Sequence, residues 1–432
     1  MAIVFVLIAL LVVAVLVTGN WYVWRRLFRD TTKGPGAVRR AGVVVIAGGW
    51  ALTVGAFVAG RGGAPFWLKQ VLAWPGYLWL ALALYLLLAV LAGELVRPVL
   101  RRILERRART AEAADAPARP EPIPAGQGTG RGPGAGTGGD GPAAADGAAP
   151  GPQETPAAPS RRLFVSRVVG GAAAAAAVGT VGYGTYGVLR GPRVKRVTVP
   201  LAKLPRAAHG YRIAVVSDIH LGPVLGRGFA QKVVDTVNST QPDLIAVVGD
   251  LVDGSVKDLG PAAAPLAQLR ARHGSFFVTG NHEYFSGAEQ WVEEVRRLGL
   301  NPLENARTEL PHFDLAGVND VAGEDEGQGP DYAKALGDRD RGRACVLLAH
   351  QPVQIHDAVD HGVDLQLSGH THGGQLFPGN LVAGLANPTL AGLDRYGDTQ
   401  LYVSRGAGAW GPPTRVGAPS DVTVIELASK QA

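Results

Sequence analysis

Five polar clusters follow short apolar runs in the second half of this 432-residue chain, and their side chains are of the types that bind divalent metal ions. The clusters are Asp218-Ile219-His220, Gly249-Asp250, Gly280-Asn281-His282-Glu283, His350 and Gly369-His370-Thr371-His372. Carboxylate and amide oxygens together with neutral imidazoles suit a borderline ion such as Mn, Fe, Zn, Co or Ni. Side chains at positions i and i+2 of an extended backbone point the same way, so both members of the D-x-H and H-x-H pairs can approach one centre. Five such clusters predict a metal site.

The elements that must position these clusters alternate between strands and helices. The apolar runs before the clusters are short and rich in β-branched residues, which predicts buried strands at 213–217, 244–248, 276–279, 346–349 and 365–368. Further strands are expected at 314–318, 401–405 and 422–427. Apolar side chains at helical spacing predict helices at 229–240 and 288–298. Because ligand sites in open α/β sheets form at the carboxyl ends of strands, all five clusters can converge in an α/β sandwich.

In this order the five clusters resemble the motifs of the calcineurin-like metallophosphoesterase superfamily. The longer run from Gly369 to Gln375, with a membrane anchor before it, is similar to the membrane-associated bacterial branch. Some members of that branch are exported by the twin-arginine route, and others are assigned by similarity as UDP-2,3-diacylglucosamine pyrophosphatases. The resemblance implies an α/β domain over 195–432, with the β-sandwich flanked by helices that is typical of the superfamily.

The resemblance also implies two divalent metal ions, whose identity stays open, and a set of ligands for each. The first ion would be held by Asp218, His220, Asp250 and His372. The second would be held by Asp250, Asn281, His350 and His370, with Asp250 bridging the two ions. His282 would contact the phosphoryl group or the leaving oxygen instead of a metal. Asp253 and Gln375 lie close to ligands in the sequence and are candidates to support them.

This set of residues predicts a metal-dependent phosphoric ester hydrolase. Two neighbouring cations act on both ends of an in-line displacement, and they lower the pKa of a bound water to near neutrality. The expected reaction is hydrolysis of a phosphoester or pyrophosphate bond by a metal-bound hydroxide. His282 would then support the departing oxygen.

The first part of the chain carries long uncharged runs that predict membrane spans. Residues 1–106 contain three of them, at 1–24, 41–60 and 71–93, each close to the ~20 residues that cross a bilayer as a helix. A fourth run, 168–189, is rich in Ala and Gly and only weakly apolar. The preceding Ser160-Arg161-Arg162-Leu163-Phe164 resembles a twin-arginine export signal, although a basic flank on an ordinary span is an alternative. Segment 161–190 therefore predicts a signal or a fourth transmembrane helix.

The linker and the basic loops predict how the chain is threaded. Residues 107–160 are dominated by Ala, Gly and Pro, which predicts a disordered linker. Lys and Arg concentrate in 25–40 and 97–109, with only two between the second and third runs. Basic loops mark the cytoplasmic side, so the catalytic domain of this multi-pass cell-membrane protein is predicted to be extracytoplasmic. The basic residues within 190–196 argue against that orientation.

The distribution of charge along the chain limits the kinds of substrate or macromolecule that we expect the protein to bind. Residues 200–432 carry 19 Lys and Arg against 27 Asp and Glu, whereas residues 1–199 carry 23 against 9. An acidic domain has no basic track for a phosphate backbone, so no nucleic acid is expected. Tethering favours a phosphoester substrate that is lipid-linked or close to the membrane. The alternatives are a catalytically reduced membrane sensor or scaffold, and a nucleotide or nucleic-acid phosphodiesterase of the same superfamily.

Overall fold

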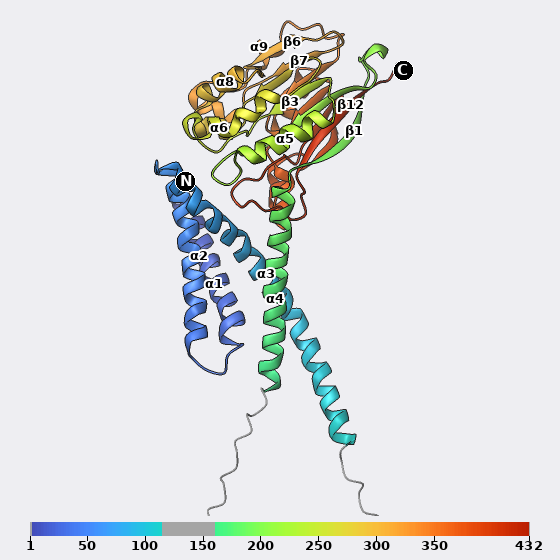
Figure 1. Ribbon diagram of the computed structural model, residues 1–432. Coiled ribbons are helices and arrows are strands. Elements are labelled where there is room, and N and C mark those ends of the chain that lie inside the picture. Colours follow the sequence, from blue (N-terminus) through green and yellow to red (C-terminus); the bar gives the residue numbers. More distant parts are fainter. Residues whose placement is uncertain (1, 115–159, 432) are drawn as a thin grey trace, which may run out of the picture.

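The structure, a computed structural model, describes residues 2–114 and 160–431 (Figure 1). Its first part is helical and consists of α1 (Ala2–Trp24), the π-helical turn η1 (Arg25–Arg29), α2 (Ala37–Arg61), α3 (Phe66–Ala114) and α4 (Arg161–Leu189). Among the described residues, three helices are long and apolar enough to cross a membrane: α2, α3 over Phe66–Thr110, and α4. The sequence predicted about four membrane spans, and three of the predicted spans coincide with these helices. The first predicted run forms α1, whose side chains are described only in part.

Helix α3 is longer at both ends than its predicted span of 71–93. It begins at Phe66 and continues through an Arg- and Glu-containing segment to Ala114, because Arg, Glu, Leu and Ala all favour helix. Helix therefore replaces the start of the predicted linker, residues 107–114. The rest of that linker, 115–159, lies outside the described residues.

The domain that follows α4 contains two six-stranded sheets packed face to face, as the fold prediction required. The first sheet consists, in spatial order, of β1 (Arg193–Leu201), β12 (Asp421–Ser429), β2 (Tyr211–Val216), β3 (Leu244–Val248), β4 (Ser275–Val278) and β5 (Asn301–Pro302). The second consists of β10 (Gly392–Tyr396), β11 (Thr399–Val403), β9 (Leu365–Ser368), β8 (Cys345–Leu348), β7 (Asp314–Gly317) and β6 (Ala306–Glu309). Within the sheets, β2, β3 and β4 are parallel to one another, and so are β7, β8 and β9.

Three apolar layers hold this sandwich together. Ile213, Leu244 and Leu315 belong to the layer between the sheets. The outer face of the first sheet is covered by α5 (Arg227–Ser239), α6 (Val256–Ala263) and α8 (Ala288–Arg297). The outer face of the second is covered by α9 (Tyr332–Leu336) and α10 (Ile355–Asp360). Two further short helices, α7 (Asn281–Ser286) and α11 (Gly379–Ala386), lie in loops.

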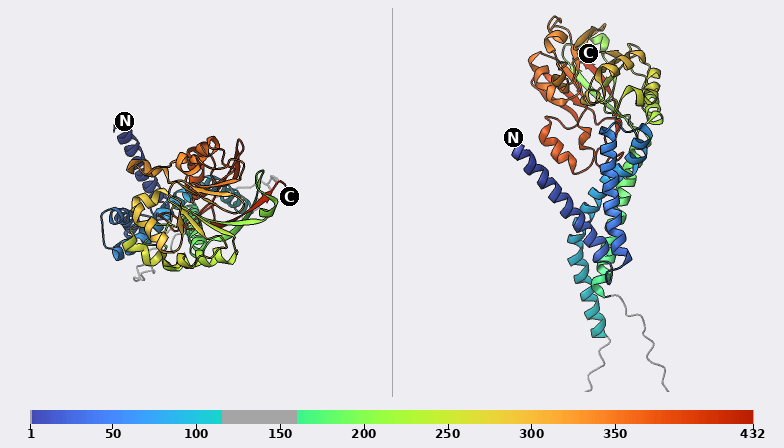
Figure 2. Two further views of the ribbon diagram at one scale, coloured as in Figure 1. Left: turned by 90° about the horizontal axis from the view of Figure 1, so that it is seen from above. Right: turned by 90° about the vertical axis from the view of Figure 1, so that its left-hand side faces the viewer.

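The domain that contains the two sheets sits directly on one end of the helical bundle (Figures 1 and 2). Helix α4 leads into β1 after a short turn, and Thr185 of α4 lies 2.7 Å from Thr414 between their hydroxyl oxygens. The Tyr85 hydroxyl of α3 donates to the Phe377 carbonyl at 2.9 Å. This end of the bundle carries the turn between α2 and α3, whereas η1 and the last turns of α3 lie at the opposite end (Figure 1).

Candidate metal centre

The predicted ligands all follow strands that end at the same edge of the two sheets. Asp218 and His220 follow β2, Asp250 follows β3, Asn281 opens α7 after β4, His350 follows β8, and His370 and His372 follow β9. Because the carboxyl ends of parallel strands meet at one edge, residues more than 150 positions apart in the chain become neighbours: His220 and His372 are separated by 152 positions.

The backbone at these positions adopts a conformation that L-residues rarely take. Five of the predicted ligands have a positive φ: Asp218 (52°), His220 (49°), Asp250 (52°), His370 (72°) and His372 (52°). Such conformations cost on the order of 1–3 kcal/mol each and gather at functional sites. Gly249 also has a positive φ, of 72°, and a Cβ there would lie 2.6 Å from the His350 ring. The turns therefore direct these side chains into one space. Packing alone does not explain why the chain tolerates the conformational free-energy cost of these turns.

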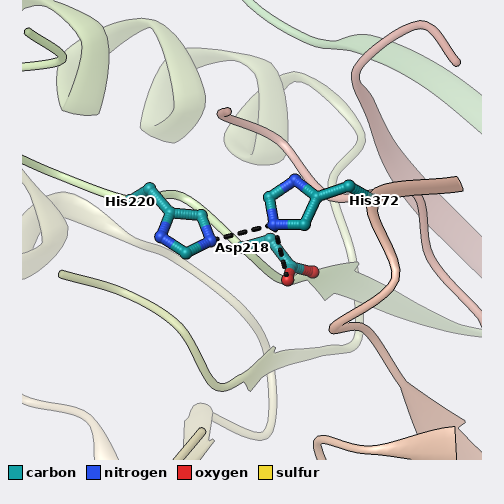
Figure 3. Close-up of side chains that lie close together, drawn as sticks. All are labelled: Asp218, His220 and His372. Atoms are coloured by element: carbon teal, nitrogen blue, oxygen red, sulfur yellow. Dashed lines mark hydrogen bonds and ion pairs between the residues drawn. The ribbon is translucent and has the colours of Figure 1, made fainter. Parts of the chain in front are cut away.

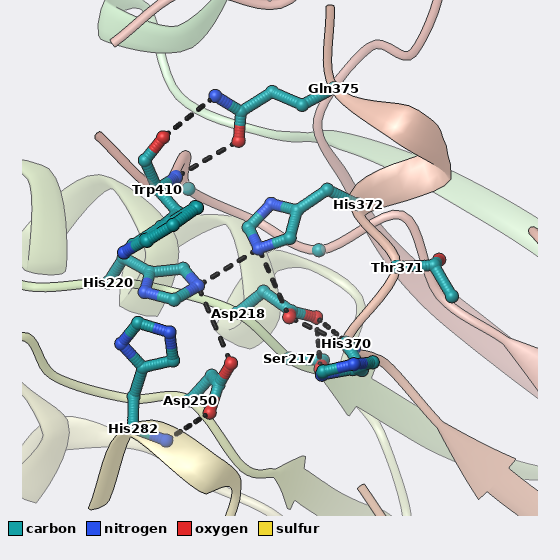
Figure 4. A network of polar contacts seen from close by, with 12 residues as sticks. Ser217, Asp218, His220, Asp250, His282, His370, Thr371, His372, Gln375 and Trp410 are labelled. Atoms are coloured by element: carbon teal, nitrogen blue, oxygen red, sulfur yellow. Dashed lines mark hydrogen bonds and ion pairs between the residues drawn. The ribbon is translucent and has the colours of Figure 1, made fainter. Parts of the chain in front are cut away.

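The donor atoms of these side chains lie within a few ångströms of one another (Figures 3 and 4). Asp250 Oδ2 lies 3.2 Å from His350 Nε2 and 3.7 Å from His220 Nε2. On one side, His372 Nε2 lies 3.4 Å from Asp218 Oδ1. Among the described residues, three triads have all donor atoms within 4.8 Å: Asp218 with His220 and His372, His220 with Asp250 and His282, and Asp250 with His350 and His370.

Asn281 joins the cluster through His370, whose Nδ1 lies 3.0 Å from the Asn281 Oδ1. The structure therefore brings together all seven predicted ligands and also His282. Their roles as ligands stay predictions.

The chemistry of the donor set fits divalent cations. His350 donates from Nδ1 to the Val248 carbonyl at 2.9 Å, which leaves Nε2 directed at the cluster. That Nε2 is buried, has no hydrogen-bond partner, and faces the Asp250 carboxylate. A buried imidazole nitrogen and a buried carboxylate at this distance need positive charge between them, which either a proton on Nε2 or a bound metal ion supplies. A ligating histidine that donates from its other nitrogen to a carbonyl or carboxylate is the usual arrangement at metal sites.

The electrostatics of the cluster favour positive charge close to Asp250 but not at His370. Burial opposes ionisation of Asp250, yet His350 and His220 hold the pKa of its carboxyl well below the usual range. Burial opposes protonation of His220, yet Asp253 and Asp250 raise the pKa of its imidazole to about 9. Burial and the neighbouring His350 lower the pKa of His370 to about 4, which keeps that ring neutral. Metal ions bind ionised carboxylates and neutral imidazoles, and they displace protons when they bind.

Asp253 contacts two members of the cluster. Its Oδ1 lies 3.0 Å from His220 Nδ1 and 2.7 Å from His282 Nδ1. The contact with His220 leaves Nε2 of that ring directed at the cluster. Proximity in the sequence had made Asp253 a candidate, and the structure places it as the support for both rings.

Arg415 is a neighbour of the cluster that the sequence did not reveal. It is buried, its Nη1 donates to the His372 carbonyl at 3.0 Å, and its Nη2 lies 3.0 Å from His372 Nδ1. Gln375, by contrast, contacts the predicted ligands through its backbone, whose N–H donates to the His372 carbonyl at 3.2 Å. Its amide bonds the backbone of Trp410 and Pro412 and so fixes the loop at the rim (Figure 4).

Glu283 clamps the loop that carries Asp250. Its buried carboxylate accepts hydrogen bonds from the backbone N–H groups of Asp250 (2.9 Å), Leu251 (2.7 Å) and Gly280 (2.6 Å). Removing one partner of a buried hydrogen bond costs about 1–3 kcal/mol per group left unpaired. We expect Glu283→Ala to lower the free energy of unfolding by roughly 3 kcal/mol or more. Thermal unfolding of the detergent-solubilised full-length protein measures this effect.

The matched control for this substitution is Glu293→Ala. Glu293 is an exposed position on the neighbouring helix α8. The Glu293→Ala substitution should leave the midpoint of thermal unfolding unchanged. Equal midpoints for the Glu283→Ala and Glu293→Ala variants would show that Glu283 does not stabilise the fold.

Comparison with known proteins identifies the family. The family model for the calcineurin-like phosphoesterases matches residues 211–374. A "Transmembrane protein with metallophosphoesterase domain" from Danio rerio is 39% identical over 264 residues, which cover 58% of this chain and 60% of that protein. An "Uncharacterized metallophosphoesterase" from Helicobacter pylori (strain J99) is 39% identical over 57% of this chain and 67% of that protein. Another from Aquifex aeolicus is 35% identical over 55% of this chain and 92% of that protein.

The chain belongs to the calcineurin-like metallophosphoesterase family. It spans less than two thirds of the Danio rerio relative's length.

Proposed function

We propose that this chain is a membrane-anchored, dinuclear-metal phosphoesterase that hydrolyses a phosphoester or pyrophosphate bond in a lipid-linked or membrane-proximal substrate. One observation carries the proposal. A cavity of about 550 Å³ is lined on one side by the candidate metal cluster and on the other by the membrane helices α2 and α3. The cluster contributes His220, Asp250, Asn281, His282, His370 and His372, and the helices contribute Phe57, Gly60, Arg61, Lys69 and Tyr77.

The chain's own residues fit a two-ion site. Asp218, His220, Asp250 and His372 would hold one ion, and Asp250, Asn281, His350 and His370 the other. When bound, such a pair lowers the pKa of water and neutralises charge on phosphoryl oxygens. Asp253 holds the His282 ring at Nδ1, which leaves Nε2 available to hydrogen-bond the leaving oxygen. Trp410 and Phe285 pack edge-on against the same ring and limit its movement.

The membrane side of the cavity suits an anionic head group that carries an apolar tail. Phe57 and Tyr77 pack edge to face, with their ring centroids 5.6 Å apart. The Arg61 guanidinium lies 6.0 Å from the Phe57 ring and has no carboxylate partner among the described residues. Lys69 is paired with Asp258 at 3.4 Å. Arginine matches the geometry of phosphate oxygens, so Arg61 is the group that would receive a second phosphate or a charged head group.

The arrangement of the helices also supports an extracytoplasmic catalytic domain. The domain lies at the end of the bundle opposite to η1 and the end of α3 (Figure 1). The basic residues of 25–40 lie in η1, the turn after it and the start of α2, and those of 97–109 lie in the last turns of α3. The positive-inside rule places them in the cytoplasm, so the domain would face the other side. Protease accessibility in intact cells tests this orientation.

A substrate panel tests the proposed function. Full-length protein in lipid nanodiscs, loaded in turn with Mn, Zn, Fe, Co and Ni, should hydrolyse lipid-linked phosphates faster than free nucleotides or sugar nucleotides. The result that would overturn the lipid assignment is a preference for soluble nucleotides. No hydrolysis of any phosphoester by metal-loaded protein would favour the catalytically reduced sensor.

Arg61→Gln gives a sharper test of the lipid assignment. Loss of a charge-assisted contact of about 1.5–3 kcal/mol should lower kcat/KM for a lipid-linked phosphate by about tenfold or more. Hydrolysis of bis-p-nitrophenyl phosphate, which has no second phosphate or charged head group for Arg61 to bind, should change little. Lys257→Gln, an exposed cation on the nearby α6, is the control and should affect neither substrate. Equal losses of kcat/KM on both substrates would show that Arg61 does not contribute to the choice of substrate.

A further inference from the structure

An uncharged, apolar lobe projects from the catalytic domain between the cluster residue His372 and Asp394. No charged residue occurs from 373 to 393, although about one residue in five of 200–432 is charged. Helix α11 lies in this lobe and has no buried residue. Of the nine large apolar side chains that are exposed among the described residues 193–431, five lie here: Phe377, Leu381, Val382, Leu385 and Leu393. Their concentration in one segment marks a surface that binds something apolar.

The lobe begins beside the membrane helices. Leu376 and Val416 pack against the cluster that α1, α3 and α4 form around Ala81, Tyr85 and Ala177. Tyr85, whose hydroxyl binds the Phe377 carbonyl, lies within the uncharged run of α3. Helix α11 starts two residues after Phe377, so it cannot lie far from the depth at which α3 crosses the apolar layer. The right-hand view of Figure 2 shows the orange segment at the lower edge of the domain, beside the upper part of the helices.

We propose that α11 is an interfacial membrane helix that lies in the plane of the bilayer, with Leu381, Val382 and Leu385 among the lipid chains. The helix has eight residues, far fewer than the ~20 that cross a bilayer. It is uncharged, and its exposed fractions rise to 71% at Val382 and 89% at Leu385. The same chain already spans the membrane next to it, so the lipid surface is the partner within reach.

Docking of α11 has a consequence for the metal cluster. The Thr371 hydroxyl donates to the Leu390 carbonyl at 2.6 Å, and Thr371 lies between His370 and His372. The lobe is therefore bonded to the loop that carries two predicted ligands. A bilayer that holds α11 in its interface would also hold that loop, and the mouth of the cavity, at a fixed height above the lipid.

Fluorescence quenching at single labelled cysteines tests the position of α11. The native Cys345 is buried, and burial raises the pKa of its thiol to about 12, so an added exposed cysteine is labelled selectively. Leu385→Cys and, as a second position, Leu381→Cys receive an environment-sensitive dye in the full-length protein. Ala333→Cys on α9, which is exposed and lies on the side of the domain away from the helices (Figure 1), is the control.

In nanodiscs of phosphatidylethanolamine and phosphatidylglycerol, lipid-attached nitroxides should quench positions 385 and 381 several-fold more strongly than position 333. Aqueous iodide should show the reverse order. Equal access of iodide to all three positions would overturn the proposal. Shielding of 385 from iodide without nitroxide quenching would also overturn it, because a second copy of the chain would then cover the helix. The outcome does not depend on hydrolysis, so it stands apart from the proposed function.

Discussion

Asp250→Asn should lower the turnover of bis-p-nitrophenyl phosphate by about 10³-fold or more and loosen both metal ions. Asp250 belongs to two of the three donor triads, one with His220 and one with His350. An amide in its place presents an N–H donor, or at best one neutral oxygen, where a bridging carboxylate presents two charged oxygens. Elemental analysis of the purified variant, beside the rate on the same preparation, measures both effects.

The control for this substitution makes the same chemical change elsewhere on the domain. Asp360→Asn, at an exposed position on α10, should retain the wild-type rate and metal content. Chelation of the wild-type enzyme should remove activity, and adding back one divalent ion at a time should restore it. An Asp250→Asn protein with full activity and full metal content would end the two-ion assignment.

The candidate ligands could be predicted because each belongs to a local pattern. Asp218 with His220, and His370 with His372, are pairs within three positions of each other, and each pair follows an apolar run that forms a buried strand. Arg415 could not be found in this way. It lies 43 positions after His372 in a loop without a motif, and its contact with that ring depends on how the loop folds back.

The fold was predictable to a similar extent and for a similar reason. Every predicted strand is present, because buried strands carry uninterrupted apolar runs. The sequence did not reveal β1, which alternates exposed and partly buried residues and contains basic side chains, nor β10, whose middle residues are exposed. Edge strands of this kind leave a weak hydrophobic signal.

The position of the domain on the membrane helices also could not be predicted from local sequence patterns. The contacts that fix it join positions far apart, such as Lys69 with Asp258 and Tyr85 with Phe377. Phe57 and Arg61 read in the sequence as the end of an ordinary span. Only their place beside His282 in the folded chain shows that they line the same cavity. Substrate selection can therefore depend on residues outside the family domain.

His282→Ala should lower turnover by about 10²–10⁴-fold while metal content stays at the wild-type level. The His282 ring lies in the cavity with its Nδ1 2.7 Å from Asp253, and its backbone N–H donates to Asp250 at 2.9 Å. The substitution keeps that backbone bond and removes only the ring. If Nε2 supports the leaving oxygen, the loss should be greater for a phenyl ester than for a p-nitrophenyl ester, because p-nitrophenolate departs without help.

Two outcomes would contradict this role for His282. His282 also forms a donor triad with His220 and Asp250, so loss of a metal ion from the variant would make it a ligand. An equal loss of rate on the two esters would make its role independent of the leaving group. His209→Ala, at an exposed histidine remote in sequence from every cluster, should change neither the rate nor the metal content. The triad geometry permits His282 to be a metal ligand, whereas its contact with Asp253 supports a role in contacting the substrate. The metal content of the His282→Ala variant decides between these two roles.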